Sequence, residues 1–157
     1  MAFLPFALPI CLWVMFSDLK HMKIRNTAVL ALIGVYAVVG LVALPMDQYL
    51  AGWVNGIVML VIGFIASSFG AVGAGDAKIF AAISLFVARG DISKFTILLA
   101  ACLLVGFVAH RLARSSSLAL NLAPNWESWH RPNEFPAGLS LGFLLIIYLV
   151  CAAFFNN

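Results

Sequence analysis

The stretch GAVGAGDAKIF, residues 70–80, decides how this sequence is interpreted. It places Asp76 and Lys78 directly after a run of glycines, in a chain of 157 residues that is 64% hydrophobic and only 10% charged. Soluble domains carry about 25% charged residues, so this composition indicates a protein whose main solvent is lipid. In such a chain an ionisable group beside an apolar segment is a candidate functional group.

Charged residues divide the sequence into apolar segments. Because a transmembrane helix needs about 20 apolar residues, we predict an all-α membrane protein of about six transmembrane helices, forming one integral-membrane domain over residues 1–157. The fourth span is the least certain, because its uninterrupted apolar run covers only residues 79–88. If this segment does not span the membrane, the number of spans is five and the C-terminus lies on the opposite side of the membrane. The predicted spans are about residues 2–16, 27–45, 49–70, 76–92, 95–110 and 137–155.

The distribution of lysine and arginine predicts the orientation. Two basic residues, Arg89 and Lys94, fall on one side of the predicted topology, and seven fall on the other. Cytoplasmic loops carry the excess of basic residues, so we expect the seven-residue side to be cytoplasmic and both termini to be periplasmic. The net charge of +3 then reflects membrane orientation and not nucleic-acid binding. The seven residues are Lys20, Lys23, Arg25, Lys78, Arg111, Arg114 and Arg131.

Two aspartates occupy the cytoplasmic ends of predicted spans. Asp18 follows the first span, and Asp76 begins the fourth. Taken singly, Asp76 is consistent with a helix N-cap, and Asp18 with a counter-charge to Lys20 and Lys23. Taken together they lie at one depth and on one face, and both adjoin short apolar segments that draw flanking residues toward the hydrocarbon. We therefore expect the two carboxyl groups to meet just inside the membrane boundary.

Two such carboxyl groups can share one proton. At about 4 Å, two negative charges repel by roughly 4 kcal/mol at an effective dielectric of 20, which corresponds to about three pKa units. One group then stays protonated near neutral pH while the other is ionised. An ionised and a neutral carboxyl are the general base and general acid that an aspartic protease needs to direct water at a peptide bond.

The glycines and Lys78 are expected to shape this site. Gly70, Gly73 and Gly75 allow positive φ and close backbone approach, so the segment can leave helical geometry beside a water-lined cavity. Lys78, two residues after Asp76, points to a different helix face. We interpret it as a phosphate or interface anchor and not as the partner of Asp76.

No cofactor or metal site is predicted. Cys11, Cys102 and Cys151 lie in apolar runs without metal-ligand spacing, so we interpret them as buried apolar side chains. His21, His110 and His130 fall in predicted cytoplasmic loops, and we expect them to be solvated there.

Five other polar or aromatic residues are candidates for contacts in the membrane or with a substrate. Trp126 and Trp129 are typical of a loop at the lipid headgroups, or they dock a substrate near the aspartates. Glu127 and Glu134 can attract a basic peptide, although exposed pairs contribute only about 0–1 kcal/mol. Asn55, inside the third span, predicts an interhelical hydrogen bond, with a site-lining role as the alternative.

Three motifs resemble the type IV prepilin peptidases, a family of GxGD intramembrane aspartyl proteases. GAGD (73–76) matches the GxGD signature, SDLKHMKIRN (17–26) is similar to the first-aspartate segment, and NEFPAGLSLGF (133–143) resembles the start of the last span. The resemblance covers the whole chain and is closest to the short CpaA/TadV-like form of tight-adherence (Flp) pilus systems.

The resemblance implies an enzyme of the bacterial inner membrane. It would cleave the basic leader from Flp-type prepilins at the cytoplasmic face, with Asp18 and Asp76 as catalytic residues. Its implied partners are these prepilins, the lipid bilayer and other pilus or secretion assembly proteins. The residues that it marks as shaping the site or contacting substrate are Gly73, Gly75, Lys78, Asn26 and Pro136.

Two features depart from the family pattern. Arg25 stands where the family usually has proline, although Ile24 and Asn26 are retained. The cytoplasmic domain with paired cysteines that longer members use for N-methylation has no room between residues 16 and 27, so the resemblance implies cleavage without methyl transfer.

Three other functions are weighed against the prepilin peptidase. A small proton- or ion-coupled transporter would use the same carboxyl groups as a relay, but its acidic residues would be distributed through the membrane. A non-catalytic subunit of a secretion or pilus assembly complex would not need the aspartates. A protease of the signal-peptide-peptidase type would carry a PAL tripeptide before its last span, which this sequence lacks.

Overall fold

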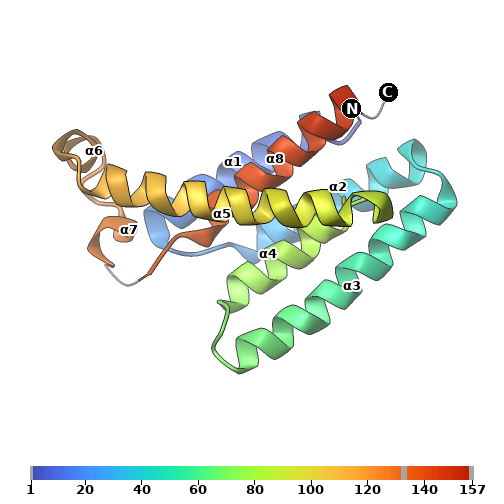
Figure 1. Cartoon of the computed structure of the whole chain (residues 1–157), viewed down its shortest axis with the longest axis horizontal. Helices are drawn as coiled ribbons and strands as arrows, with labels where there is room; N and C mark the ends of the chain where they lie inside the picture. Colours follow the sequence, from blue (N-terminus) through green and yellow to red (C-terminus); the bar gives the residue numbers. More distant parts are fainter. Residues whose placement is uncertain (1, 132–133, 156–157) are drawn as a thin grey trace.

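The structure is a computed structural model that describes residues 2–131 and 134–155 (Figure 1). Asn133, the first residue of the 133–143 motif, and residues 156–157 lie outside the described residues. The described part contains helices and no strand, which confirms the predicted all-α class. The helices are α1 (Leu4–His21), α2 (Asn26–Ala43), α3 (Met46–Ser68), α4 (Ala74–Ser84), the short 3₁₀ helix η1 (Arg89–Asp91), α5 (Ile92–Arg114), α6 (Ser117–Leu122), α7 (Glu127–His130) and α8 (Ala137–Phe155).

Four helices of the described chain are long and apolar enough to cross a membrane: α2, α3, α5 together with η1, and α8. The six-span count and the side of the termini remain predictions. The helix bounds also differ from those expected. α1 continues past Phe16 to His21, so the polar connection shrinks to residues 22–25, and α5 continues to Arg114.

The helix expected over residues 76–92 ends already at Ser84. Its eleven residues extend about 16 Å at 1.5 Å each, against a hydrocarbon core of about 30 Å. The following backbone is supported from other helices, since Asn55 Nδ2 donates to the carbonyl of Val87 (2.9 Å) and the N–H of Ala88 donates to Tyr148 Oη (3.0 Å). Non-helical backbone is tolerated at membrane depth when protein groups satisfy it in this way. The sequence predicted an interhelical hydrogen bond for Asn55, but its partner is this non-helical backbone and not another helix.

α8 is the central helix. It packs lengthwise against α1 and α5 (Figure 1). Its buried residues Leu141, Leu144, Leu145, Tyr148 and Leu149 recur at the three- and four-residue spacing of one helix face. This face closes the core of the bundle.

α3 and α4 form a second close pair, which Figure 1 shows projecting from the bundle of α1, α5 and α8. Small residues let the two helices approach, because a Cβ on Gly63 would lie 2.9 Å from the Cβ of Ala77. Most of the remaining surface of α3, including Val61 and Phe64, is exposed and apolar, which suits contact with lipid.

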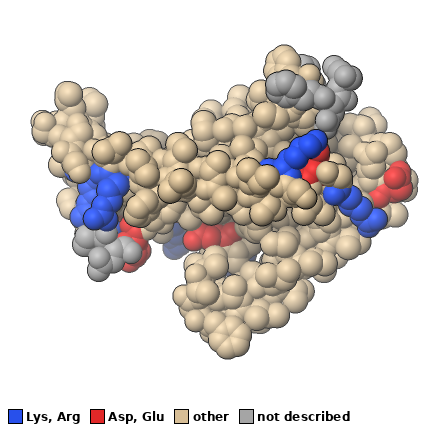
Figure 2. Space-filling view, in the orientation of Figure 1, with Lys and Arg blue, Asp and Glu red and all other residues tan. Residues whose placement is uncertain are grey.

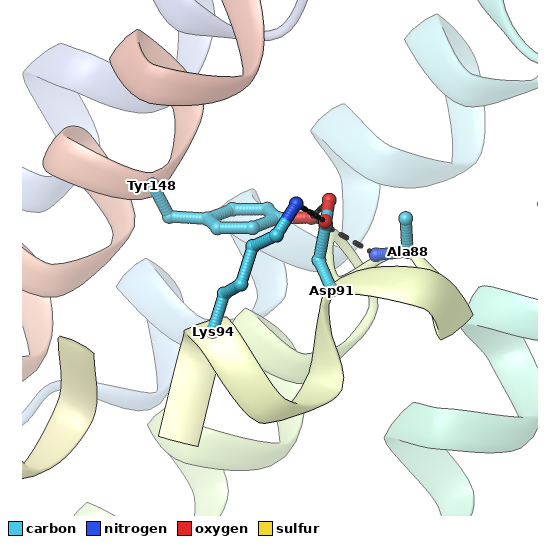
Figure 3. A network of polar contacts seen from close by, with 4 residues as sticks. All are labelled: Ala88, Asp91, Lys94 and Tyr148. Carbon is cyan, nitrogen blue, oxygen red and sulfur yellow. Dashed lines mark hydrogen bonds and ion pairs between the residues drawn. The ribbon is translucent and has the colours of Figure 1, made fainter. Parts of the chain in front are cut away.

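A polar network joins η1, α5 and α8 (Figure 3). Tyr148 Oη donates to Asp91 Oδ2 (3.2 Å), and Lys94 Nζ lies 3.1 Å from Asp91 Oδ1. Phe3, which precedes α1, and Ala153 of α8 line a small cavity next to this network. We call this part of the molecule, where α1 begins and α8 ends, the far end.

Candidate functional site

Asp18 lies in the last turn of α1, and the local sequence ends the helix just beyond it. Met22 adopts a left-handed backbone (φ 48°), and its N–H donates to the carbonyl of Asp18 at 2.8 Å. This is a usual helix C-terminal geometry. Ser17 Oγ donates to the carbonyl of Lys23 at 2.9 Å, so the connection to α2 is held against the turn that carries Asp18.

The Asp18 side chain is buried, with 5% of its surface exposed. Its Oδ2 accepts a hydrogen bond from the backbone N–H of Gly138, at 2.8 Å. Gly138 is the second residue of α8. The Asp18 carboxyl therefore joins the end of the first helix to the beginning of the last one.

Asp76 lies in the first turn of α4 and is half-buried. The N-cap of α4 is Gly73, so the N-cap interpretation of Asp76 is wrong. A Cβ on Gly73 would lie 2.9 Å from Asp76 Oδ2. Gly73 therefore leaves the space into which this carboxyl points.

The glycines act differently from the prediction. Among the described residues Gly70 is the one glycine with positive φ (73°), and it starts the turn between α3 and α4. Gly73 has an ordinary φ of −62°. A Cβ on Gly75 would make an ordinary contact of 3.5 Å with Ile24. Gly70 thus provides the backbone turn, and Gly73 provides room.

Both aspartates line one cavity of about 1320 Å³. We call the part of the molecule around it the cavity end. Figure 2 shows a hollow beside the α3–α4 pair with acidic and basic side chains at it, whereas most of the face in view carries neither. Side chains from α1, the 22–25 connection, α2, α4 and the segment before α8 surround the space. Besides Asp18 and Asp76, the lining includes Ser17, His21, Lys23, Arg25, Asn26, Gly73, Gly75, Lys78, Glu127, Glu134 and Phe135.

The protonation of the two carboxyl groups is perturbed by this environment. Both lie outside the four helices that qualify as membrane spans. Burial raises the pKa of Asp18 to about 6; the Gly138 N–H acts in the opposite direction, and the charge of Asp76 adds to the rise. Burial also raises the pKa of Asp76. The charge of Asp76 thus contributes to the shift at Asp18, whereas burial is the cause of the shift at Asp76.

The remaining residues predicted for the site lie on the cavity wall or next to it. Lys78 Nζ donates to Asn26 Oδ1 at 3.4 Å, which joins α4 to the beginning of α2. Pro136 is fully buried directly before α8, and its carbonyl accepts the N–H of Leu139 at 3.2 Å. Pro136 thus supports the helix start that carries Gly138.

Arg25, where the family usually has proline, has a backbone that proline also adopts. It is the N-cap of α2 with φ −77° and ψ 134°, and proline fixes φ near −65°. The departure from the family pattern therefore leaves the turn between α1 and α2 intact.

The segment between α5 and α8 differs most from expectation. His110, expected in a solvated loop, is buried on α5, and its ring stacks on Trp129 at 5.1 Å. Trp126 stacks on Trp129 at 5.7 Å and meets the edge of Phe16 at 5.8 Å. These aromatic rings hold the segment against α1 and α5, so packing explains Trp129 better than a headgroup contact does.

Arg131 neutralises the two acidic residues of this segment. Its guanidinium lies 3.0 Å from Glu134 Oε2 and 3.4 Å from Glu127 Oε2, and all three side chains are exposed. Both glutamates line the cavity wall. A basic peptide in the cavity would compete with Arg131 for them.

Within residues 2–131 and 134–155, no group of three or more His, Cys, Asp or Glu side chains is arranged to hold a metal ion. Cys11 and Cys102 are buried, Cys151 is half-buried, and all three are free thiols.

Gly138 was not among the residues that the sequence predicted for the site. The signal that indicates it is positional: the first N–H groups of a helix have no partner within the helix, and Gly138 follows Pro136 at the start of a strongly apolar span. Nothing in the sequence, however, indicates that Asp18 is the acceptor, because the contact depends on how α1 and α8 pack.

One comparison with known proteins gives a match. The family model described as "Type IV leader peptidase family" matches residues 6–110. The matched segment contains Asp18 and Asp76, whereas Pro136 and Gly138 lie beyond it. No curated protein and no solved structure matches the chain. Because the model covers more than half of the chain and both aspartates, the chain belongs to the type IV leader peptidase family.

Proposed function

We propose that this peptidase is an aspartic endopeptidase that removes the basic leader from type IV prepilins of the Flp kind. It works at the cytoplasmic face of the bacterial inner membrane, without metal or cofactor. The observation that carries the proposal is that Asp18 and Asp76, far apart in sequence, line one cavity and have raised pKa values.

The pair supplies both proton transfers of peptide hydrolysis. The ionised carboxylate takes a proton from water while the water oxygen attacks the scissile carbonyl carbon, and the neutral carboxyl gives its proton to the carbonyl oxygen. The tetrahedral intermediate then collapses: the C–N bond breaks, and the leaving nitrogen takes a proton from the carboxyl that received one from water. At the same time the other carboxylate takes a proton from a hydroxyl of the intermediate as the new carbonyl forms. The pair returns to one proton shared between two groups.

The cavity fits an extended segment of a basic leader. Its volume of about 1320 Å³ exceeds what one side chain fills. A basic side chain of the leader would replace Arg131 as the partner of Glu127 and Glu134. Prepilins, the bilayer and other pilus assembly proteins are the partners of this proposal. The connection between α1 and α2 comprises only residues 22–25, which supports cleavage without N-methyl transfer.

Co-expression with a Flp-type prepilin tests the function, with cleavage followed as a shift on a gel. Asp18→Asn and Asp76→Asn should each abolish processing, since the amide cannot exchange the proton, while membrane insertion is unchanged. Asp47→Asn is the matched control, because Asp47 is an exposed aspartate in the first turn of α3. It should leave processing at the wild-type level.

Other outcomes would support other functions. Normal cleavage by either Asp18→Asn or Asp76→Asn would overturn the aspartic mechanism. Ion flux in proteoliposomes without cleavage would favour a transporter. Pilus assembly that survives loss of both aspartates would favour a non-catalytic subunit.

A further inference from the structure

The beginning of α8 meets the Asp18 carboxyl in a buried contact. The first four N–H groups of an α-helix have no acceptor within the helix, and the N–H of Gly138 belongs to this group. It donates to Asp18 Oδ2 at 2.8 Å. A hydrogen bond to a carboxylate at a helix N-terminus is short, strong and favoured by the helix dipole.

The same glycine leaves the space that the carboxyl occupies. A Cβ at position 138 would lie 2.9 Å from Asp18 Oδ2 and 3.0 Å from both Asp18 Cγ and Cβ. Side-chain carbon atoms do not approach so closely, so any other residue would displace Asp18. The Asp76 carboxyl has no corresponding hydrogen bond, because it accepts none from the described residues.

We propose that Gly138 is a positioning residue for the peptidase reaction: its N–H and its missing side chain together hold the Asp18 carboxyl toward the cavity shared with Asp76. The proposal rests on the proposed aspartic function and goes beyond it, because it assigns a role in the site to α8. Asp18 takes part in the proton transfers together with Asp76, whereas Gly138 acts only through Asp18.

Other charged and titratable groups share the cavity with Asp18 and affect the same titration. Asp76 adds negative charge from α4, and basic residues act in the opposite direction. Comparison of variants that keep all these groups therefore isolates the contribution of Gly138. The groups on the cavity wall are Asp76, His21, Lys23, Arg25, Lys78, Glu127 and Glu134.

Nuclear magnetic resonance tests the contact without any substrate. Labelling alanine carbonyls with ¹³C and glycine nitrogens with ¹⁵N selects the Ala–Gly pairs, and the sequence contains three: Ala51–Gly52, Ala74–Gly75 and Ala137–Gly138. The Gly138 amide signal should move with pH as Asp18 ionises and lose this movement in Asp18→Asn. Gly52, packed against Tyr36 and Leu85, is the internal control and should not move. A Gly138 signal that does not titrate, or that titrates unchanged in Asp18→Asn, overturns the proposal.

The kinetics of two variants, Gly138→Ala and Gly142→Ala, test whether this contact affects catalysis. Gly138→Ala should lower kcat on the order of 10²-fold, the scale expected for a small misplacement of a catalytic group, and leave KM unchanged. The acidic limb of its pH profile should move to higher pH, because loss of the N–H bond disfavours the Asp18 carboxylate.

Gly142→Ala is the control, because a Cβ there would press on Met15 (2.6 Å from Cγ) and on the carbonyl of Cys11 (3.0 Å) in the same α1–α8 contact without reaching Asp18. It should lower the Tm and keep the wild-type pH profile. Equal pH profiles for both variants would overturn the positioning role. If the wild type cleaves no prepilin, the proposed function fails instead, and the resonance experiment still decides on Gly138. If the Gly138→Ala variant does not fold, the resonance experiment still tests the contact, because it uses a chain that retains Gly138.

Discussion

The Asp18 side chain shows how one residue balances opposing effects. Burial disfavours its charged form, the Gly138 N–H favours it, and the charge of Asp76 disfavours it again. Burial is the largest effect, and the resulting pKa of about 6 is close to the pH at which a shared proton is useful for catalysis.

This balance predicts how stability depends on pH. The pKa of Asp18 rises from 3.8 to about 6 on folding, so between these values the folded state binds more protons than the unfolded state. The free energy of unfolding therefore falls as the pH is raised through this range. At 1.36 kcal/mol per unit, the loss attributable to Asp18 is about 3 kcal/mol. Asp18→Asn should remove that part of the decrease and be more stable than the wild type at neutral pH.

Thermal unfolding in detergent between about pH 4 and pH 7 measures the effect. Asp47→Asn is again the control and should follow the wild-type curve. A wild-type Tm that rises over this range relative to Asp18→Asn would contradict the sign of the shift.

At the scale of elements, the segment after α4 depends on side chains from other helices. Tyr148 is 7% exposed and contributes both an acceptor for Ala88 and a donor for Asp91 (Figure 3). Because residues 85–88 are neither helix nor strand, their backbone depends on such contacts. The network therefore fixes the end of α4, whose other end carries Asp76.

Tyr148→Phe should be clearly destabilising. It leaves the Ala88 N–H and Asp91 Oδ2 without their hydrogen-bond partner, which costs about 1–3 kcal/mol. Lys94→Ala is the comparison, because the Lys94 side chain is 77% exposed and such an ion pair contributes only about 0–1 kcal/mol. Tm measurements in detergent should rank Tyr148→Phe well below Lys94→Ala. The reverse order would show that the surface ion pair, and not the tyrosine, holds this segment.

The sequence predicted some of these elements better than others. Charged residues at the ends of the apolar runs placed α2, α3, α5 and α8 within a few residues. The end of α4 at Ser84 could not be predicted, because the segment after it remains apolar and its stabilising partners, Asn55 and Tyr148, lie far away in sequence. The burial of His110 was missed for a related reason: only the folded chain brings Trp129 to it.

For the molecule as a whole, the pairing of α1 with α8 and of α3 with α4 could not be predicted from the sequence either. In lipid an outward-facing residue and a core residue are equally apolar, so Phe64 on the surface and Leu144 in the core look alike. That Asp18 and Asp76 line one cavity agrees with the expectation that alternating spans bring the end of the first span and the start of the fourth to one side.

The topology itself can be measured by cysteine labelling. In a variant without the native cysteines, single cysteines at Lys23 and Ala71 report the cavity end, and those at Gln48 and Lys94 report the other side. We expect a membrane-impermeant maleimide to label only positions 48 and 94 in intact cells, and all four after the membrane is opened. If positions 71 and 94 label alike in intact cells, α4 does not cross and the count is five.

Phe3 and Ala153 line the same small cavity at the far end, so the order of the helices along the chain can be changed by joining the chain there. A short linker could join a residue beside Phe3 directly to one beside Ala153, and the chain could be opened at Ser115–Ser116, between α5 and α6. Such a circular permutant would keep every helix pair while reversing the order in which α8 and α1 leave the ribosome relative to the rest. If it still cleaves, the enzyme's architecture does not depend on the sequence in which its helices are inserted.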